Sequence, residues 1–187
     1  MSRIWPGTTR SSRHTPSLRH CFMTPNIEKM TTRKLLSLVF VREASKILLG
    51  YKKRGFGQGW WNGFGGKVEK GETIMQGALR ELTEESGLIG DSLEEIGLLT
   101  FEFEGDPVLL EVHVFSTTKF SGKPEETEEM RPAWFDIQDI PFKKMWSDDV
   151  LWFPLMLKGS KFKGYFLFKG LHDILKYKLD EVDKIEY

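Results

Sequence analysis

Three glutamates stand close together near the middle of the chain, at a spacing that suits metal chemistry. Glu81, Glu84 and Glu85 occupy positions i, i+3 and i+4, which share one side of an α-helix. Clustered carboxylate oxygens are typical ligands of a hard divalent cation such as Mg²⁺, which completes its octahedral shell with water and phosphate oxygens. The spacing therefore predicts a Mg²⁺ site that acts on phosphate groups.

Signals for the start and the end of a helix surround these glutamates. Thr73 followed by Gln76 predicts a capping-box start, and Gly87 predicts the C-terminal end. At ~100° per residue, Glu81 and Glu85 lie within about 60° of the apolar row of this helix. They border the face that turns toward the protein, so solvation alone does not account for them.

The spaced pattern resembles a known motif. From Gly66 to Leu88 the chain reads GKVEKGETIMQGALRELTEESGL, which resembles the Nudix box, the signature of Mg²⁺-dependent hydrolases of nucleoside diphosphates linked to another group. The resemblance implies the α+β Nudix fold, with a mixed β-sheet sandwiched between helices.

A longer resemblance covers the run from about Arg33 to Tyr187. The segments that carry it are KKRGFGQGWWNGFGGKVEKGET, FEFEGDP, EVHVFST, EEMRPAWF, IPFKKMWSDD and WFPLMLKGSKFKGYF. They are similar to the vertebrate branch of the Nudix family that hydrolyses oxidised purine nucleoside triphosphates. This implies conversion of 8-oxo-dGTP, 2-oxo-dATP and methylated purines (N6-methyl-dATP, O6-methyl-dGTP) to the monophosphate plus diphosphate, which cleanses the nucleotide pool and prevents mutation.

The resemblance also assigns the phosphate chemistry. The metal shell that it implies consists of Glu81, Glu84, Glu85, Glu129 and the main-chain carbonyl of Gly65. For Glu129, in a crowded acidic loop, plain surface charge is the alternative. Glu85 is the predicted catalytic base and Glu81 the alternative, since their spacing does not separate them. Arg80 is predicted to orient a carboxylate, that of Glu72, through an ion pair rather than to contact substrate.

Aromatic residues farther along the chain predict a purine site. Phe101 and Phe103 alternate along a strand, so both rings point to the same face. Together with Phe56, Leu110 and Trp146, they form the walls and the stacking platform that the resemblance implies. A plain core role is the alternative for each of these residues.

By the same resemblance, Asn62, Asp148 and Asp149 read the base. Two adjacent carboxylates in an apolar pocket are costly if both are charged, so one is predicted to stay protonated. A proton on either aspartate presents different donors and acceptors to 8-oxoguanine and to 2-oxoadenine; exposed aspartates in a turn are the alternative. The further substrate-binding residues that the resemblance implies are Ser37, Lys52 and Lys67 (the two lysines facing the phosphates), Phe64, Gly65, Gly66 and Ser147.

Composition narrows the function classes. Lys+Arg and Asp+Glu balance at 27 each in 187 residues, so no overall field attracts a nucleic-acid polymer. The single cysteine, Cys21, rules out an internal disulfide and fits a reducing compartment. No apolar run approaches the ~18 residues of a membrane span. We expect a soluble monomer without a membrane partner in the cytoplasm, with the mitochondrion and the nucleus as further locations.

Residues 1–30 differ from the predicted Nudix domain of residues 31–187. They carry several arginines and no acidic residue before Glu28, a composition that resembles a mitochondrial transit peptide. A disordered tail and a variant start at Met23 or Met30 are the other interpretations.

Hydrophobic patterning predicts many strands and few helices. The predicted strands cover residues 35–41, 46–53, 98–104, 110–117, 133–137, 162–169 and 174–179. Strands 98–104 and 110–117 are expected to form an antiparallel pair. A glycine-rich loop covers 54–66, an acidic loop covers 119–130, and a second helix covers 148–158 despite Pro154.

Two other functions compete with this interpretation. Another Nudix activity, on a nucleotide sugar, a dinucleotide polyphosphate or an RNA cap, calls for a binding insertion that the sequence does not show. A non-catalytic nucleotide sensor usually lacks the glutamates of the box, and this chain keeps them all.

Overall fold

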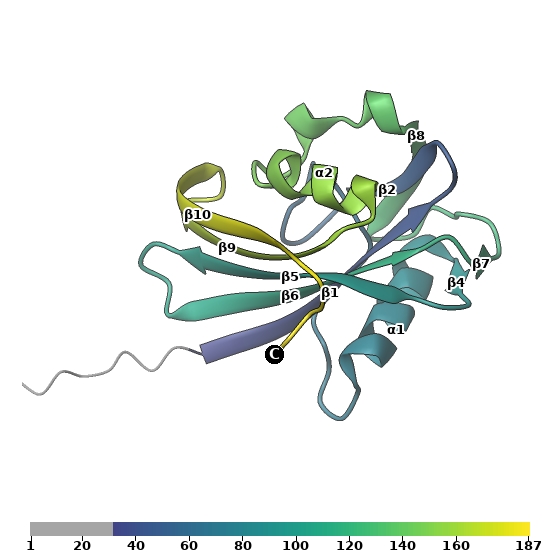
Figure 1. Ribbon diagram of the computed structural model, residues 1–187. Coiled ribbons are helices and arrows are strands. Elements are labelled where there is room, and N and C mark those ends of the chain that lie inside the picture. The colour runs from purple at the N-terminus through teal and green to yellow at the C-terminus, as the bar shows by residue number, and fades with distance from the viewer. Residues whose placement is uncertain (1–31) are drawn as a thin grey trace, which may run out of the picture.

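A mixed β-sheet lies between two helices in the computed structural model, which describes residues 32–187 (Figure 1). The predicted extension of residues 1–30 lies outside the described residues. The large sheet has the strand order β10-β9-β5-β6-β1-β2-β3, with β8 also paired to β2, and a small second sheet joins β4 to β7. The predicted α+β class and mixed sheet are confirmed, because β1–β6 and β5–β9 are parallel pairs and the other pairs are antiparallel.

The elements follow one another along the chain with short connections. The strands are β1 Thr32–Arg42, β2 Lys46–Lys52, β3 Trp61–Asn62, β4 Ile89–Gly90, β5 Glu94–Phe103, β6 Val108–Thr117, β7 Phe120–Ser121, β8 Met130–Asp136, β9 Lys161–Lys169 and β10 Asp173–Val182. The helices are α1 Ile74–Ser86 and α2 Asp149–Lys158, with 3₁₀ turns at Ile137–Asp139 and Phe142–Lys144. Neither α-helix of residues 32–187 is long and apolar enough to cross a membrane.

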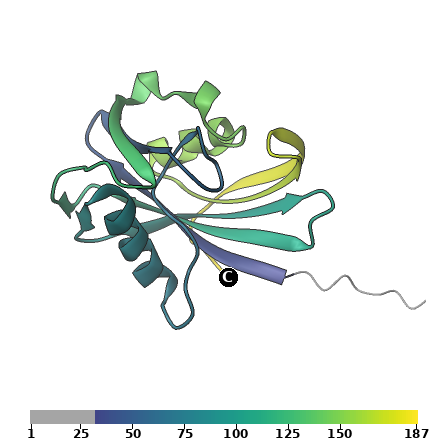
Figure 2. The same ribbon diagram turned by 180° about the vertical axis from the view of Figure 1, so that it is seen from behind.

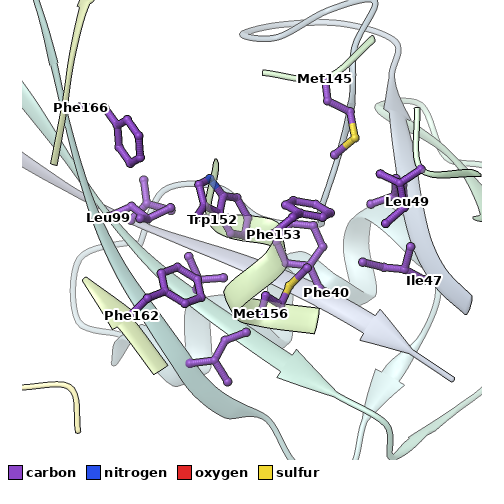
Figure 3. Packing of buried hydrophobic residues seen from close by; sticks show 14 of the residues in the cluster. Phe40, Ile47, Leu49, Leu99, Met145, Trp152, Phe153, Met156, Phe162 and Phe166 are labelled. Atoms are coloured by element: carbon purple, nitrogen blue, oxygen red, sulfur yellow. The ribbon is translucent and has the colours of Figure 1, made fainter. Parts of the chain in front are cut away.

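Strand β1 is buried on both faces and joins two hydrophobic clusters. Phe40 belongs to the cluster that contains α2, where its ring makes edge contacts with Trp152 and Phe153 (Figure 3). Its neighbour Val39 belongs to the cluster that contains Leu82 of α1. Because successive side chains of a strand point to opposite faces, α1 and α2 pack on opposite sides of the sheet, as the two opposite views show (Figures 1 and 2).

Helix α1 begins and ends where the sequence predicts. The Thr73 hydroxyl accepts a hydrogen bond from the Gln76 N–H, and the Gln76 side chain accepts one from the Thr73 N–H, which completes the capping box. Gly87 ends the helix in the left-handed region with φ 73°, where a side chain would be strained. The glutamates between these caps therefore have a fixed helical register.

β3 and β7 lie inside segments that were predicted as loops, and β8 begins before the predicted strand 133–137. β3 lies in the predicted glycine-rich loop, where Trp61 pairs with Tyr51 of β2. β8 begins at Met130, in the predicted acidic loop, because it pairs with β2 over seven residues from Asp136 to Met130. β3 and β8 depend on pairing with β2, and β7 depends on pairing with β4. Local hydrophobic patterning does not reveal such pairing.

Replacing Thr73 with Ala should lower the free energy of unfolding by about 1 kcal/mol, because one N–H of the first helical turn loses its acceptor. Urea denaturation of the wild type and the variant measures this difference. Thr73→Ser keeps the hydroxyl and should stay close to wild type; a loss in Thr73→Ser equal to that in Thr73→Ala would contradict the capping explanation.

Candidate functional site

Glu85 is the most buried glutamate of α1. Its side chain is 3% exposed. One carboxylate oxygen, Oε2, accepts a hydrogen bond of 2.8 Å from the main-chain N–H of Gly65, and the other, Oε1, lies 2.6 Å from the Nζ of Lys52. The helix is thereby joined both to the glycine-rich segment and to the end of β2.

Lys52 also links the helix to the acidic loop. Its Nζ lies 3.1 Å from Oε2 of Glu129, whose Oε1 is paired with Arg54 at 2.8 Å. Of the acidic residues in this loop, Glu126 is instead paired with Lys53, and Glu128 is exposed. The structure therefore brings Glu129 next to Glu85 through their shared contact with Lys52.

Arg80 holds three carboxylates of the box. Its guanidinium donates to both oxygens of Glu72, from Nη2 at 2.7 Å and from Nε at 3.2 Å, which confirms the predicted ion pair. Nη1 donates to Glu81 at 2.9 Å and to Glu84 at 3.1 Å. These contacts raise the pKa of Arg80 and lower that of Glu72.

Burial and pairing oppose each other at Lys52 and Glu85. Burial lowers the pKa of the Lys52 ammonium, but its contacts with Glu85 and Glu129 outweigh burial, so the net shift is upward. At Glu85, burial raises the pKa and dominates over the lowering by Lys52 and by the Gly65 N–H. Glu85 is thus a carboxylate whose affinity for a proton exceeds that of an exposed glutamate, a property suited to a general base.

Glycine is required where the loop approaches β1 and α1. A Cβ at position 65 would lie 2.0 Å from the Ser37 carbonyl oxygen, and one at position 66 would lie 2.6 Å from a Glu81 carboxylate oxygen. Hydrogen bonds from Ser37 N–H to the Gly66 carbonyl and between Val39 and Phe64 hold this segment against β1. No side chain fits at either glycine without moving backbone or a box carboxylate.

A cavity of about 440 Å³ opens on the side of the sheet that faces α2. Its aromatic lining includes Phe56, Phe101, Phe103 and Trp146, and Phe56 stacks on Trp146 with ring centroids 5.0 Å apart. Its volume and apolar lining suit a ligand of nucleotide size. Glu129, a predicted metal ligand, lines the cavity. Most of the predicted substrate residues line it as well: Ser37, Lys52, Phe56, Asn62, Gly65, Gly66, Phe101, Phe103, Leu110, Trp146, Asp148 and Asp149.

Three predicted substrate residues do not line this cavity. Phe64 is fully buried in the hydrophobic cluster with α1, because it alternates with its glycine neighbours along an extended segment. Lys67 is exposed, and only its carbonyl is used, as an acceptor from Arg80. Ser147 donates its hydroxyl hydrogen to the carbonyl of His172 at 2.8 Å.

Asp148 and Asp149 are buried side by side at the cavity wall. Asp148 accepts a hydrogen bond from the Trp152 indole N–H at 2.9 Å, and Asp149 accepts one from the Trp146 main-chain N–H at 3.1 Å. Burial raises the pKa of Asp148 to about 6. Burial and the neighbouring charge of Asp148 raise the pKa of Asp149 well above its ordinary value. The prediction that this pair resists double ionisation is therefore supported by its surroundings.

The glutamate helix, the glycine segment and the aromatic cavity correspond to one known family. The NUDIX domain model matches residues 32–156. This chain belongs to the Nudix family. It is 57% identical over 156 residues to the oxidized purine nucleoside triphosphate hydrolase of Danio rerio, covering 83% of this chain and all of that protein. It is 54% identical over 154 residues to the Mus musculus protein of the same name, covering 82% and 99%.

The fold of this Nudix chain also matches a solved structure. The mutator MutT protein of Bacillus halodurans superimposes with a TM-score of 0.69 over 79% of this chain and 97% of that one. The identity is 24%, so this match speaks for the fold. The predicted Nudix fold is confirmed.

Nudix hydrolases generally use divalent metal ions, and the donors of this chain fit one. Among residues 32–187, no group of three His, Cys, Asp or Glu side chains is arranged to hold a metal ion. Arg80 and Lys52 instead pair with the box carboxylates. The donors are nevertheless all oxygens, as hard cations require. Gly66 lets the backbone approach the Glu81 carboxylate, since a Cβ there would lie 2.6 Å from Glu81 Oε1. Gly65 and Glu129, two of the residues that would hold the ion, also line the cavity.

Several cavity residues of this Nudix site were not predicted. Leu99 precedes Phe101 by two residues on β5, and Val112 follows Leu110 by two on β6, so strand alternation was a usable signal for both. Trp152 lies one helical turn after Asp148, a spacing that also brings side chains together. Phe168 of β9 enters the cavity because β9 pairs with β5, which the sequence does not show locally.

Asp148→Asn should flatten part of the pH dependence of stability. A carboxyl whose pKa is raised on folding favours the folded state below its unfolded pKa, and this contribution is lost as the pH rises through about 6. The neutral amide does not titrate, so Asp148→Asn should gain stability relative to wild type, on the order of 2 kcal/mol, between pH 4 and pH 7.

Denaturant titrations of both proteins at steps of pH measure this difference. Asp183→Asn, at an exposed position, is the matched control for loss of one carboxylate. A difference between Asp148→Asn and wild type that stays constant with pH would show that Asp148 is not held neutral by burial.

Proposed function

We propose that this protein hydrolyses oxidised purine nucleoside triphosphates to the nucleoside monophosphate and diphosphate, with Mg²⁺ as its metal ion. The observation that carries the proposal is that a cavity suited to a base lies next to a helix suited to a metal ion. An aromatic cavity with buried polar groups at its wall adjoins the glutamate helix through Gly65 and Gly66. The names of the Danio rerio and Mus musculus relatives, at more than half identity over most of this chain, support the substrate class.

The cavity residues bind and orient the base. The rings of Phe56, Phe103 and Trp146 offer flat surfaces to a purine. The Asn62 amide can both donate and accept hydrogen bonds. Its oxygen already accepts one hydrogen bond, from the Gly63 N–H. The paired aspartates add a carboxyl that donates and a carboxylate that accepts, since burial disfavours charge on both.

The helix residues act on the triphosphate. Mg²⁺ bound by Glu81, Glu84, Glu85, Glu129 and the Gly65 carbonyl would shield phosphate charge and acidify a bound water. Glu85 takes the proton of the attacking water, because burial raises the pKa of its carboxylate despite the contacts with Lys52 and the Gly65 N–H. Lys52, at the cavity edge, is placed to pair with phosphate oxygens. Arg80 orients the box carboxylates and does not line the cavity.

The proposed substrate class also accounts for the apolar cavity wall. A modified purine differs from its parent by one exocyclic group, so selection must come from hydrogen bonds with the cavity's few polar atoms. The monomeric state and the cytoplasmic, mitochondrial and nuclear locations stay predictions.

A panel of triphosphates tests the proposal. We expect kcat/KM for 8-oxo-dGTP or 2-oxo-dATP to exceed that for dGTP and dATP at least tenfold, because unmatched buried polar groups cost about 1–3 kcal/mol. Chromatography should show the monophosphate, and a phosphate assay should show diphosphate rather than orthophosphate. N6-methyl-dATP and O6-methyl-dGTP complete the panel.

ADP-ribose and a diadenosine polyphosphate are the controls for other Nudix activities. A higher kcat/KM on either control than on every modified purine would overturn the proposal, as would the absence of turnover with any substrate in the presence of Mg²⁺.

A further inference from the structure

A group of stacked rings joins three separate segments at the mouth of the cavity. Trp60 ends the loop between β2 and β3, Trp146 precedes α2, and His172 lies in the turn between β9 and β10. The Trp60 ring stacks on His172 with centroids 4.6 Å apart and an interplanar angle of 20°, and on Trp146 at 6.0 Å and 27°. Trp146 and His172 are 6.4 Å apart.

Trp146 is the only member of this ring group that lines the cavity described above. Its indole is held in place by neighbours on several sides. Phe56 stacks on it, and a Cβ at Gly57 would lie 3.2 Å from its ring. Trp60 and His172 are absent from the cavity lining, and their link to the cavity runs through the Trp146 ring.

A hydrogen bond ties the same turn to the start of α2. The hydroxyl of Ser147 donates to the carbonyl of His172 at 2.8 Å. Ser147 stands between Trp146, which offers its ring to the cavity, and Asp148, which offers its carboxyl. The β9–β10 turn is therefore attached to the base-reading segment twice, through a ring and through the backbone.

We propose that Trp60 and His172 are positioning residues for base recognition. By stacking on each other and on Trp146, they fix the plane of the indole, while Ser147 fixes the chain that carries Asp148. They set how tightly the base is held and leave the phosphate step unchanged, because the stacking contacts of their rings reach Trp146 and, within residues 32–187, no ring stacking of theirs reaches α1. The contact of Trp60 with Lys52 runs through its main-chain carbonyl, which a change of side chain keeps. This role rests on the proposed function.

The test compares three substitutions in one turn. His172→Ala removes the ring, His172→Phe keeps a flat ring, and Leu171→Ala changes the exposed neighbour as the matched control. For each, the Kd of 8-oxo-dGMP and the kcat and KM for 8-oxo-dGTP are measured, together with the near-ultraviolet circular dichroism of the free protein.

We expect His172→Ala to raise Kd and KM about threefold to tenfold, the range that one stacked aromatic pair contributes, with kcat within about twofold of wild type. His172→Phe should restore both constants and the circular dichroism of the stacked indoles, and Leu171→Ala should match wild type throughout. If His172→Ala does not fold, Trp60→Phe and Trp60→Leu give the same comparison from the other ring.

Unchanged Kd and KM in His172→Ala, or an equal loss in His172→Phe, would overturn the positioning role. A fall in kcat without a rise in KM would also overturn it, because the stack would then act on the phosphate step. If wild type neither binds 8-oxo-dGMP nor hydrolyses the triphosphate, the proposed function fails, and a circular dichroism difference between the Ala and Phe variants would still report the stack itself.

Discussion

The arrangement of the site depends on the hydrogen bond from the Gly65 N–H to the buried Glu85 carboxylate. It fastens α1 to the segment that runs along β1, and that segment leads directly to the cavity residue Asn62. Only glycine allows this segment to lie so close to β1, because a Cβ at position 65 would lie 2.0 Å from the Ser37 carbonyl oxygen. The Gly65–Glu85 contact fixes the position of the glutamate helix, which we propose acts on the phosphates, relative to the cavity, which we propose holds the base.

Neighbouring carboxylates repel one another both at the helix and at the cavity wall, and this repulsion is reduced differently in the two places. At the helix, several carboxylates are crowded together, and Arg80 and Lys52 offset their repulsion through direct pairing. At the cavity wall no cation of residues 32–187 forms an ion pair with Asp148 or Asp149, and burial raises the pKa of both. Pairing with Arg80 and Lys52 offsets the repulsion among the helix carboxylates, whereas burial favours a proton on the aspartates of the cavity, where a donor can distinguish one purine from another. We therefore propose that the helix acts on the phosphates and that the cavity recognises the base.

The sequence predicted what depends on local spacing and did not predict what depends on pairing between distant segments. The capping box at Thr73, the stop at Gly87 and the Arg80–Glu72 ion pair lie within one short stretch and were foreseen. The inward rings of Phe101 and Phe103 followed from strand alternation. By contrast, β8 gains its first residues by pairing with β2, and the ring stack of Trp60 on His172 joins residues far apart in the chain. Phe64 shows a further limit: resemblance assigned it to the substrate, but the alternation of an extended segment turns it into the core.

The claim that chemistry and recognition are separate is tested most directly with Glu85→Gln. The amide keeps the shape of the side chain and removes the charge and the base, so kcat should fall about a hundredfold or more, while the Kd for the 8-oxo-dGMP product stays within about threefold of wild type. Glu128→Gln, at an exposed position beside Glu129, is the matched control and should keep both constants. Turnover near that of wild type in Glu85→Gln, or a loss of product binding as large as the loss of turnover, would contradict the account.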